Sequence, residues 1–176
     1  MFGAVVGLTP AAIMLMASRA RGVIAAALSV ERAFALDIAP MPGGSCRTYR
    51  PITLVSVEAH ACTETGISAQ ERCTTLRALG AWDASPADFR APGHVIVTVV
   101  PSRLAVAGQP AVLSEIAYRH AARNEGALAI AWTDVLDDRG SIASVSYCRA
   151  LAAECGLPCL ELRDGATIRA AIASAA

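Results

Sequence analysis

The apolar residues of the chain fall into patterns that predict alternating strands and helices. Apolar runs at 23–28, 95–100 and 127–135 are typical of strands buried on both faces, and the β-branched stretch 51–59 predicts another strand. Helical periodicity predicts helices over 10–22, 31–36, 68–79 and 110–126, and one that ends at Glu154. A short strand at 159–162 and a helix beginning at Asp164 close the pattern. Because strands alternate with helices, we expect an α/β layered fold.

The length and the N-terminal pattern predict one soluble domain. The 176 residues contain no internal repeat or low-complexity linker, so residues 1–176 are expected to form a single domain. The chain is apolar up to Ala17, but no charge precedes this run, Pro10 interrupts it, and Arg19 and Arg21 follow it. This arrangement is unlike a signal peptide and too broken to span a bilayer. We therefore expect a cytoplasmic protein with no membrane partner.

The charged residues exclude several function classes. Fifteen Arg balance fifteen Asp plus Glu, and this neutral charge with few aromatic residues argues against a nucleic-acid partner. The chain has no Lys, which excludes Schiff-base chemistry, a pyridoxal phosphate anchor and a Walker-type phosphate loop. The cysteines form no Cys-x-x-Cys pair and are expected to be free thiols in a reducing compartment; they lie at positions 46, 62, 73, 148, 155 and 159.

The segment from Thr63 to Arg72 is expected to organise the candidate site. It leaves the strand at 51–59, turns at Gly66 and enters a helix at Ser68. Ser68 and Glu71 have the spacing of a capping box, in which the Ser68 hydroxyl accepts from the Glu71 amide and the Glu71 carboxylate accepts from the Ser68 amide. A strand that enters a helix through such a turn can direct free amides at an anion, although an ordinary capped turn explains the same residues.

Two blocks of sequence resemble the 3,4-dihydroxy-2-butanone 4-phosphate synthase family. Residues Thr65–Arg72 are similar to its Thr-Gly-(Val/Ile)-Ser-Ala-x-Asp-Arg motif, and Pro92-Gly93-His94 to its Arg-Pro-Gly-His motif, with Ala91 at the Arg position and Arg90 one residue earlier. The segment 22–41 also resembles a family segment, and the resemblance extends from about Thr9 to Asp164. It implies a single-domain α/β sandwich with a mixed sheet flanked by helices, a homodimer, and sites near the subunit interface.

The resemblance also implies a reaction and a set of residues. The family converts ribulose 5-phosphate to 3,4-dihydroxy-2-butanone 4-phosphate and formate in riboflavin biosynthesis. His94 matches the catalytic histidine, and Asp134 stands where the family has an essential Glu, so both are candidate catalytic residues that carry protons. The candidate substrate-binding residues are Thr65, Ser68, Arg72, Gly108 and Gln109.

The magnesium site of the family is altered in this chain. Gln109 stands where the family has a metal-binding His; an amide oxygen can coordinate Mg²⁺ but cannot titrate. Val106 and Pro110 replace an Arg and a Thr that hold the substrate, and Arg103 is a nearby substitute cation. The family's first strand and acidic loop have no counterpart, because no acidic residue precedes Glu31.

Three hypotheses therefore remain open. The chain is an active but divergent lyase of this kind, a non-catalytic homologue that acts as a regulatory or dimer partner, or an enzyme that uses a related sugar phosphate without metal. Loss of the first strand would expose an edge of the sheet. We expect either a partner or the apolar segment Met1–Leu8 to cover that edge.

Overall fold

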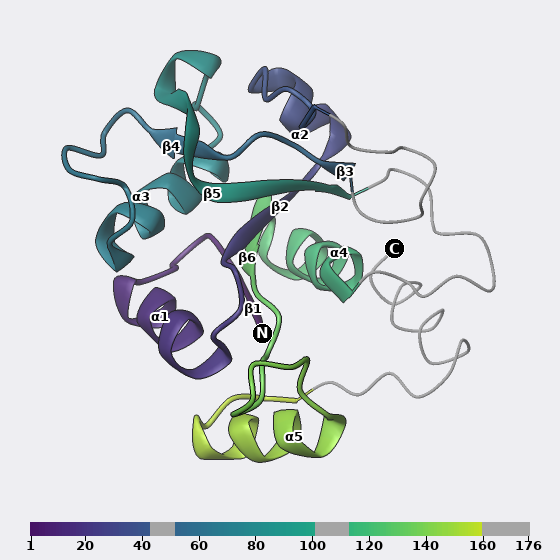
Figure 1. Cartoon of the computed structure of the whole chain (residues 1–176). Coiled ribbons are helices and arrows are strands. Elements are labelled where there is room, and N and C mark those ends of the chain that lie inside the picture. Colours follow the sequence, from purple (N-terminus) through teal and green to yellow (C-terminus); the bar gives the residue numbers. More distant parts are fainter. Residues whose placement is uncertain (43–51, 101–112, 160–176) are drawn as a thin grey trace.

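A mixed β-sheet forms the centre of the protein (Figure 1). The computed structural model describes residues 1–42, 52–100 and 113–159. The sheet has the order β1-β6-β2-β5-β3, and β4 pairs with β5. Strands β2 and β5 are parallel and the other pairs are antiparallel. The strands are β1 (Phe2–Ala4), β2 (Ala25–Ser29), β3 (Ile52–Thr53), β4 (Val57–Ala59), β5 (Phe89–Val100) and β6 (Ala129–Trp132).

Most helices begin at the residues that the sequence predicts, because their caps are local. Thr9, Ser29 and Ser68 each accept an amide hydrogen bond through the side chain at the start of a helix. The α-helices are α1 (Pro10–Leu15), α2 (Val30–Ala35), α3 (Ala69–Leu79), α4 (Leu113–Glu125) and α5 (Val145–Glu154). A π-helical turn, η1 (Met16–Ala20), continues α1, and a 3-10 turn, η2 (Pro86–Asp88), precedes β5.

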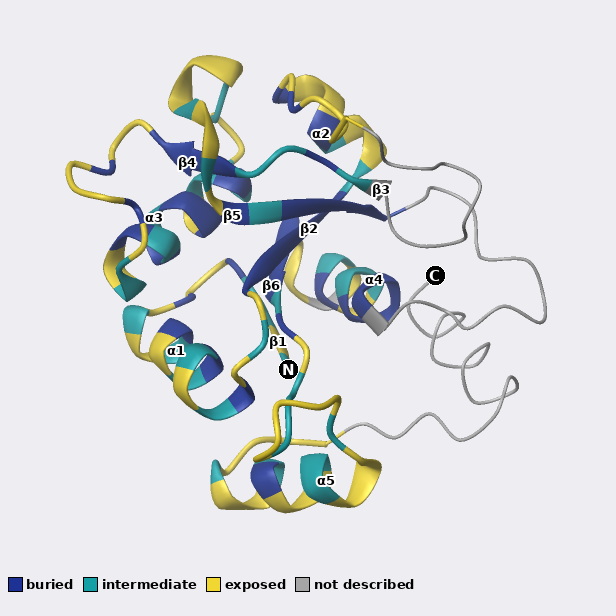
Figure 2. Ribbon diagram, viewed as in Figure 1, coloured by how far each residue is buried: buried dark blue, intermediate teal, exposed yellow. Residues whose placement is uncertain are grey.

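Helices cover both faces of the sheet, as the uninterrupted apolar strands require. On one face, Ala26 and Leu28 of β2 pack in a large cluster that includes Ile13 of α1 and Leu76 of α3. Between them in sequence, Ala27 points to the other face and joins a smaller cluster with residues of α4. Figure 2 shows the buried strands at the centre and the exposed outer sides of the helices. The predicted α/β sandwich with a mixed sheet is confirmed.

Several predicted strand boundaries differ from the structure, and the strand expected at 127–135 is shorter, as β6 (Ala129–Trp132). The stretch 51–59 contains two short strands, β3 and β4, instead of one. Strand β5 begins at Phe89, so Pro92-Gly93-His94 lies inside the strand and not in a loop before it. These last two differences follow from the irregular pairing of β4 with β5, which depends on tertiary contacts. Of the strand expected at 159–162, Cys159 is not in a strand, and the remainder lies with the helix at Asp164 outside the described residues.

The apolar N-terminal segment supplies a strand at one side of the sheet. Strand β1 pairs antiparallel with β6, and Val5 and Leu8 are buried beneath it. Residues of Met1–Leu8 therefore cover the edge that β6 would otherwise present. No helix within residues 1–42, 52–100 and 113–159 is long and apolar enough to cross a membrane.

Candidate active site

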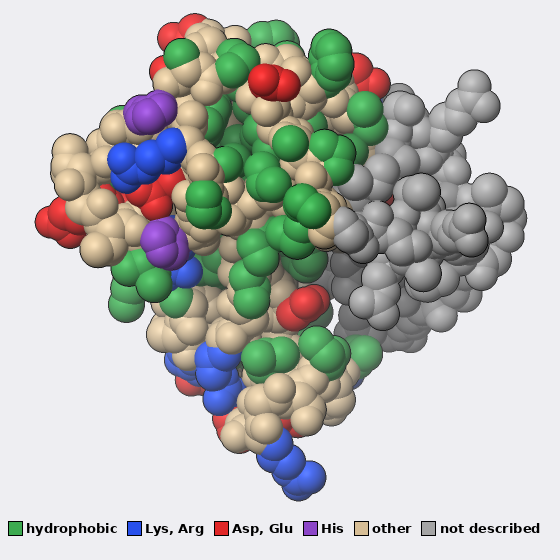
Figure 3. Space-filling model, turned by 45° about the horizontal axis from the view of Figure 1, so that its top comes forward, with side chains coloured by type: hydrophobic (Ala, Val, Ile, Leu, Met, Phe, Trp, Pro, Cys, Tyr) green, Lys and Arg blue, Asp and Glu red, His purple; other side chains and the backbone are tan. Residues whose placement is uncertain are grey.

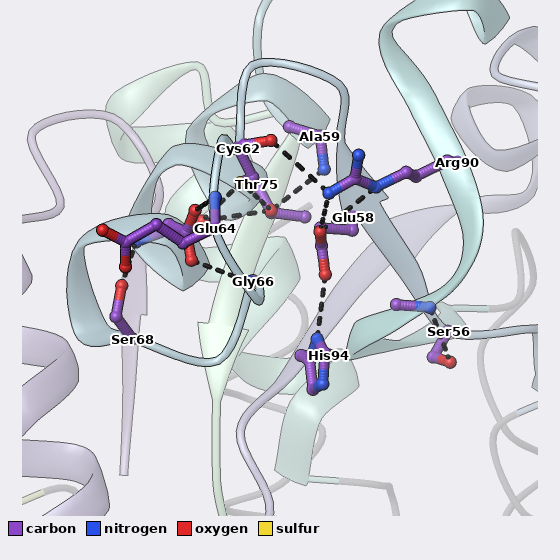
Figure 4. Close-up of polar contacts among 12 residues, drawn as sticks. Ser56, Glu58, Ala59, Cys62, Glu64, Gly66, Ser68, Thr75, Arg90 and His94 are labelled. Atoms are coloured by element: carbon purple, nitrogen blue, oxygen red, sulfur yellow. Dashed lines mark hydrogen bonds and ion pairs between the residues drawn. The ribbon is translucent and has the colours of Figure 1, made fainter.

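An irregularity in the pairing of β4 with β5 positions the predicted catalytic histidine. Val57 lies opposite Val95, but the next residue of β4, Glu58, lies opposite Arg90. The segment Ala91–His94 is therefore extra length in β5 between two adjacent positions of β4, and within this bulge the Gly93 amide still donates to the Ser56 carbonyl at 3.1 Å. Arg90 and His94 stand at the two ends of this bulge, and both side chains turn toward Glu58 (Figure 4).

Glu58 holds both of these side chains through a single buried carboxylate. Its Oε2 lies 2.8 Å from His94 Nδ1, and its Oε1 accepts from Arg90 Nε at 3.2 Å and also from Arg90 Nη2. The Glu58 side chain is 6% exposed, whereas those of Arg90 and His94 are 43% and 42% exposed. Hydrogen bonds from Arg90 first, and then from His94, lower the pKa of Glu58. The carboxylate is thus ionised near neutral pH while the imidazole remains open to a ligand.

Two glycines allow the backbone to close around this carboxylate. A β-carbon on Gly93 would lie 2.1 Å from the Val57 carbonyl carbon and 2.4 Å from the Glu58 nitrogen. A β-carbon on Gly66 would lie 1.7 Å from Glu58 Oε2, and Gly66 has a φ of +77°. Glycine therefore has a steric reason at both positions. Since Gly66 belongs to the turn before α3, the two sequence blocks that resemble the same family meet at Glu58.

Of the two hydrogen bonds predicted for the capping box at the start of α3, the structure has one. The Ser68 hydroxyl accepts from the Glu71 amide at 3.1 Å, which confirms one hydrogen bond of the capping box. The prediction for the Glu71 carboxylate was wrong, because it accepts from the amides of Glu64 at 2.7 Å and Gly66 at 2.6 Å. The turn at Gly66 directs these amides back over the first turn of the helix, where Glu71 is buried. Two amides expected to face an anion are therefore occupied by the chain's own carboxylate.

The three substrate-binding candidates in this block have different surroundings. Thr65 is exposed, and the Ser68 side chain caps α3. Arg72 is partly buried, and its Nε is the one buried side-chain nitrogen or oxygen of the described residues without a hydrogen-bond partner. Desolvation lowers the pKa of Arg72. Arg72 thus retains a donor that an anion could satisfy, whereas the other two offer hydroxyl groups.

Asp134 lies at the same end of the sheet as His94 but follows a different strand, β6. Strand β2 separates the two: its Ala25 is opposite Ile96 on β5 and Trp132 on β6. His94 lies two residues before Ile96, and Asp134 lies two residues after Trp132. Both residues therefore lie just beyond the same end of the region in which β2 pairs with β5 and β6. Neighbouring strands are about 4.8 Å apart, which places the two strands about 10 Å from each other. Asp134 is exposed.

A pocket of about 240 Å³ shares Arg90 with this cluster. Its lining combines apolar side chains with Asp37 and Arg90, and the full set is Leu36, Asp37, Ile38, Val55, Val57, Pro86, Phe89, Arg90 and Ala91. Asp37 belongs to the 22–41 segment and has a φ of +51°. Figure 3 shows histidine, arginine and acidic side chains gathered beside a broad apolar area on this face of the molecule.

Comparison with known proteins agrees with the arrangement of the two blocks. The profile of the 3,4-dihydroxy-2-butanone 4-phosphate synthase family matches residues 2–166. The chain belongs to this family. It is 30% identical over 159 residues to the synthase of Vibrio harveyi, covering 89% of this chain and 67% of that protein. It is 32% identical over 162 residues to the synthase of Agrobacterium fabrum, covering 89% and 73% of the two chains.

A solved structure of the same family has the same fold. A crystal structure of 3,4-dihydroxy-2-butanone 4-phosphate synthase in complex with two magnesium ions superposes with a TM-score of 0.77 and 29% identity. The match covers 98% of this chain and 83% of that one. The neighbour therefore establishes magnesium binding for another member of the synthase family.

The described part of the present synthase homologue does not offer a matching set of metal ligands. Within residues 1–42, 52–100 and 113–159, no three His, Cys, Asp or Glu side chains are grouped to hold an ion. The buried carboxylates of Glu58 and Glu71 are already bound by internal donors. Gly108 and Gln109, together with the metal role predicted for Gln109, lie outside the described residues. No chemical step is therefore assigned to a metal here.

Sequence reasoning missed Glu58, although a signal was present. A charged residue stands between Val57 and Ala59 in a strand that is otherwise apolar, and all three residues are buried. A buried carboxylate requires partners. That requirement could have marked Glu58 as part of a site. It could not have identified the partners of Glu58, because the bulge in β5 supplies them.

Proposed function

We propose that this member of the family is a lyase that converts ribulose 5-phosphate to 3,4-dihydroxy-2-butanone 4-phosphate and formate in riboflavin biosynthesis. The observation that supports this most is the exposed imidazole of His94, oriented by Glu58 at the point where the two family motifs meet. A fixed, accessible imidazole is suited to proton transfer at a ketose.

The first chemical step would be enolisation of the substrate. The C–H bond next to the ketone breaks, its proton passes to the imidazole of His94, and its electron pair becomes the enolate. Asp134, at the same end of the sheet, would exchange the second proton during the rearrangement that releases formate. We propose that Arg72, with its unsatisfied Nε, and the hydroxyls of Thr65 and Ser68 bind the sugar phosphate, together with Gly108 and Gln109.

We propose the remaining properties on the basis of the family resemblance. We expect a one-domain, cytoplasmic homodimer that uses Mg²⁺ when it is active, with Gln109 as one ligand. The polar groups available to such an ion in the described residues are few, because Glu58 and Glu71 are engaged.

The test is formate release from ribulose 5-phosphate by the full chain, with magnesium and with a chelator. The proposal expects formate, lost in His94→Gln and Asp134→Asn, and a raised KM in Arg72→Gln. His60→Gln is the matched control, because His60 is exposed and bonds to Asp88 through its backbone amide. Formate that resists chelation would indicate a metal-free sugar-phosphate enzyme.

One observation favours a second candidate, the non-catalytic homologue. The Glu71 carboxylate occupies the amides of Glu64 and Gly66, so a substrate phosphate cannot use them without displacing it. A folded protein that releases no formate in either condition would support this candidate. Its function would then be that of a regulatory or dimer partner.

A further inference from the structure

The two carboxylate oxygens of Glu58 have different partners. This arrangement determines which ring nitrogen of His94 carries the hydrogen. Oε1 is held by Arg90 and Oε2 by His94 Nδ1. A guanidinium is charged at every pH at which proteins are studied, so it favours the ionised form of the acid beside it. An ionised carboxylate can only accept hydrogen bonds. The 2.8 Å contact therefore requires a hydrogen on Nδ1.

A neutral imidazole has one N–H, so a hydrogen on Nδ1 leaves the lone pair on Nε2. Nε2 is then the atom that can accept a proton from a ligand. In the opposite tautomer, Nδ1 would direct a lone pair at a carboxylate oxygen, and Nε2 would be a donor unable to accept a proton. The tautomer thus decides whether the ring can act as a base toward solvent or substrate.

The packing around Glu58 prevents the carboxylate from turning to another partner. Gly66 lies against Oε2, and Gly93 lies against the backbone that carries Glu58. The side chain is almost completely buried, whereas the His94 ring and the Arg90 guanidinium that contact it are partly exposed (Figure 4). Of the other carboxylates nearby, that of Glu71 binds two amides and that of Glu64 is exposed.

We propose that Glu58 is a positioning residue that holds neutral His94 as the Nδ1–H tautomer, leaving Nε2 as the atom that accepts the substrate proton, while Arg90 keeps Glu58 ionised. The tautomer is a property of the free protein. Only the role of Nε2 in proton transfer rests on the proposed function.

The direct test is ¹⁵N NMR of histidine-labelled protein without substrate. The chain has 3 His, and His60→Gln and His120→Gln assign the His94 signals by elimination. At pH 8.5, well above the ordinary imidazole pKa of about 6.5, we expect the protonated-nitrogen shift at Nδ1 and the unprotonated shift at Nε2. A His94 ring protonated mainly at Nε2 under these conditions would overturn the inference in the wild-type protein itself.

The variant Glu58→Gln tests the cause of the tautomer. Its amide can accept from Arg90 and donate to Nδ1, so the preference should reverse toward the Nε2–H form. Glu64→Gln is the matched control, because it removes a nearby exposed carboxylate without touching His94, and it should leave the tautomer unchanged. If Glu58→Gln folds and His94 keeps the Nδ1–H form, Glu58 is not the positioning group.

Kinetics separate this inference from the proposed function. In an active protein, Glu58→Gln should lower kcat for formate release by about 10²-fold or more and change KM by less than about threefold, because substrate contacts remain. An inactive wild type with the Nδ1–H tautomer would refute the proposed function and leave the positioning role intact. An active wild type with the Nε2–H tautomer would support the proposed function and refute the positioning role of Glu58.

Discussion

Gly66 and Glu58 are in direct contact, although they belong to different elements: a β-carbon on Gly66 would lie 1.7 Å from Glu58 Oε2. The turn that precedes α3 is thus one wall of the site that holds His94. This relationship couples the conformation of the turn to the orientation of the imidazole, since Glu58 touches both.

Gly66→Ala should destabilise the protein and disturb His94 together. The alanine must adopt a φ of +77°, and its methyl group must displace the Glu58 carboxylate. Together these effects should lower the free energy of unfolding by about 2–4 kcal/mol. Gly140→Ala is a close control, since Gly140 has the same φ but no atom within 4 Å of the added carbon. Urea unfolding of both variants measures the difference. Equal losses would show that the contact with Glu58 has no energetic weight.

Gly93→Ala should be more damaging, because the atoms it meets belong to the backbone. The added carbon would lie 2.1 Å from the Val57 carbonyl carbon, and strand β4 cannot move away without breaking its pairing with β5. We expect a loss of at least about 3 kcal/mol or failure to fold. Gly3→Ala in β1, where the added carbon meets nothing within 4 Å, should change stability by less than about 0.5 kcal/mol. A stable Gly93→Ala protein would contradict the close approach of the strands.

Acid should weaken the protein partly through Glu58. Arg90 and then His94 lower the pKa of Glu58 below its ordinary 4.5 in the folded state. The stabilisation from its ionised form is therefore complete above pH 4.5 and is lost as the pH falls through the lower folded value. Glu58→Gln should lose less stability than wild type between pH 6 and pH 3 in urea unfolding. If the stability of the two proteins falls in parallel with pH, the pKa of Glu58 is the same in the folded and unfolded states.

Glu71→Gln should loosen the turn before α3. A neutral amide oxygen can replace only one of the two acceptor oxygens that bind the Glu64 and Gly66 amides, and the replacement bond is weaker. We expect a loss of about 1–3 kcal/mol in unfolding free energy and faster hydrogen exchange at the Gly66 amide. Gln70→Ala, an exposed change on the same helix turn, is the control. Unchanged exchange at Gly66 would show that Glu71 does not hold the turn.

The parts of the fold that the sequence predicts correctly depend on local interactions. Ser29 and Ser68 mark helix starts because each side chain bonds an amide three residues away. The buried strand at Ala25–Leu28 is predicted by its uninterrupted apolar run, since helices cover both faces. The turn at Gly66 is predicted by its place between a strand and a capped helix, whereas His94, expected before the strand at 95–100, lies inside β5.

The parts that escape prediction depend on residues distant in sequence. The Glu71 carboxylate has a local partner in its capping box, but the turn at Gly66 presents two better-placed amides. Glu58 has its role only because Arg90 and His94 approach it from another strand. The partners of Glu71 depend on the geometry of the turn at Gly66, and those of Glu58 depend on the bulge in β5.

The bulge has one more consequence, for how this segment can evolve. Arg90 and His94 reach the same carboxylate because the extra residues Ala91–His94 lie between the two positions of β5 that pair with Val57 and Glu58. Inserting or deleting one residue there would pull apart the two groups that share Glu58. Mutational drift in this segment should therefore be recorded as substitutions and not as changes in length.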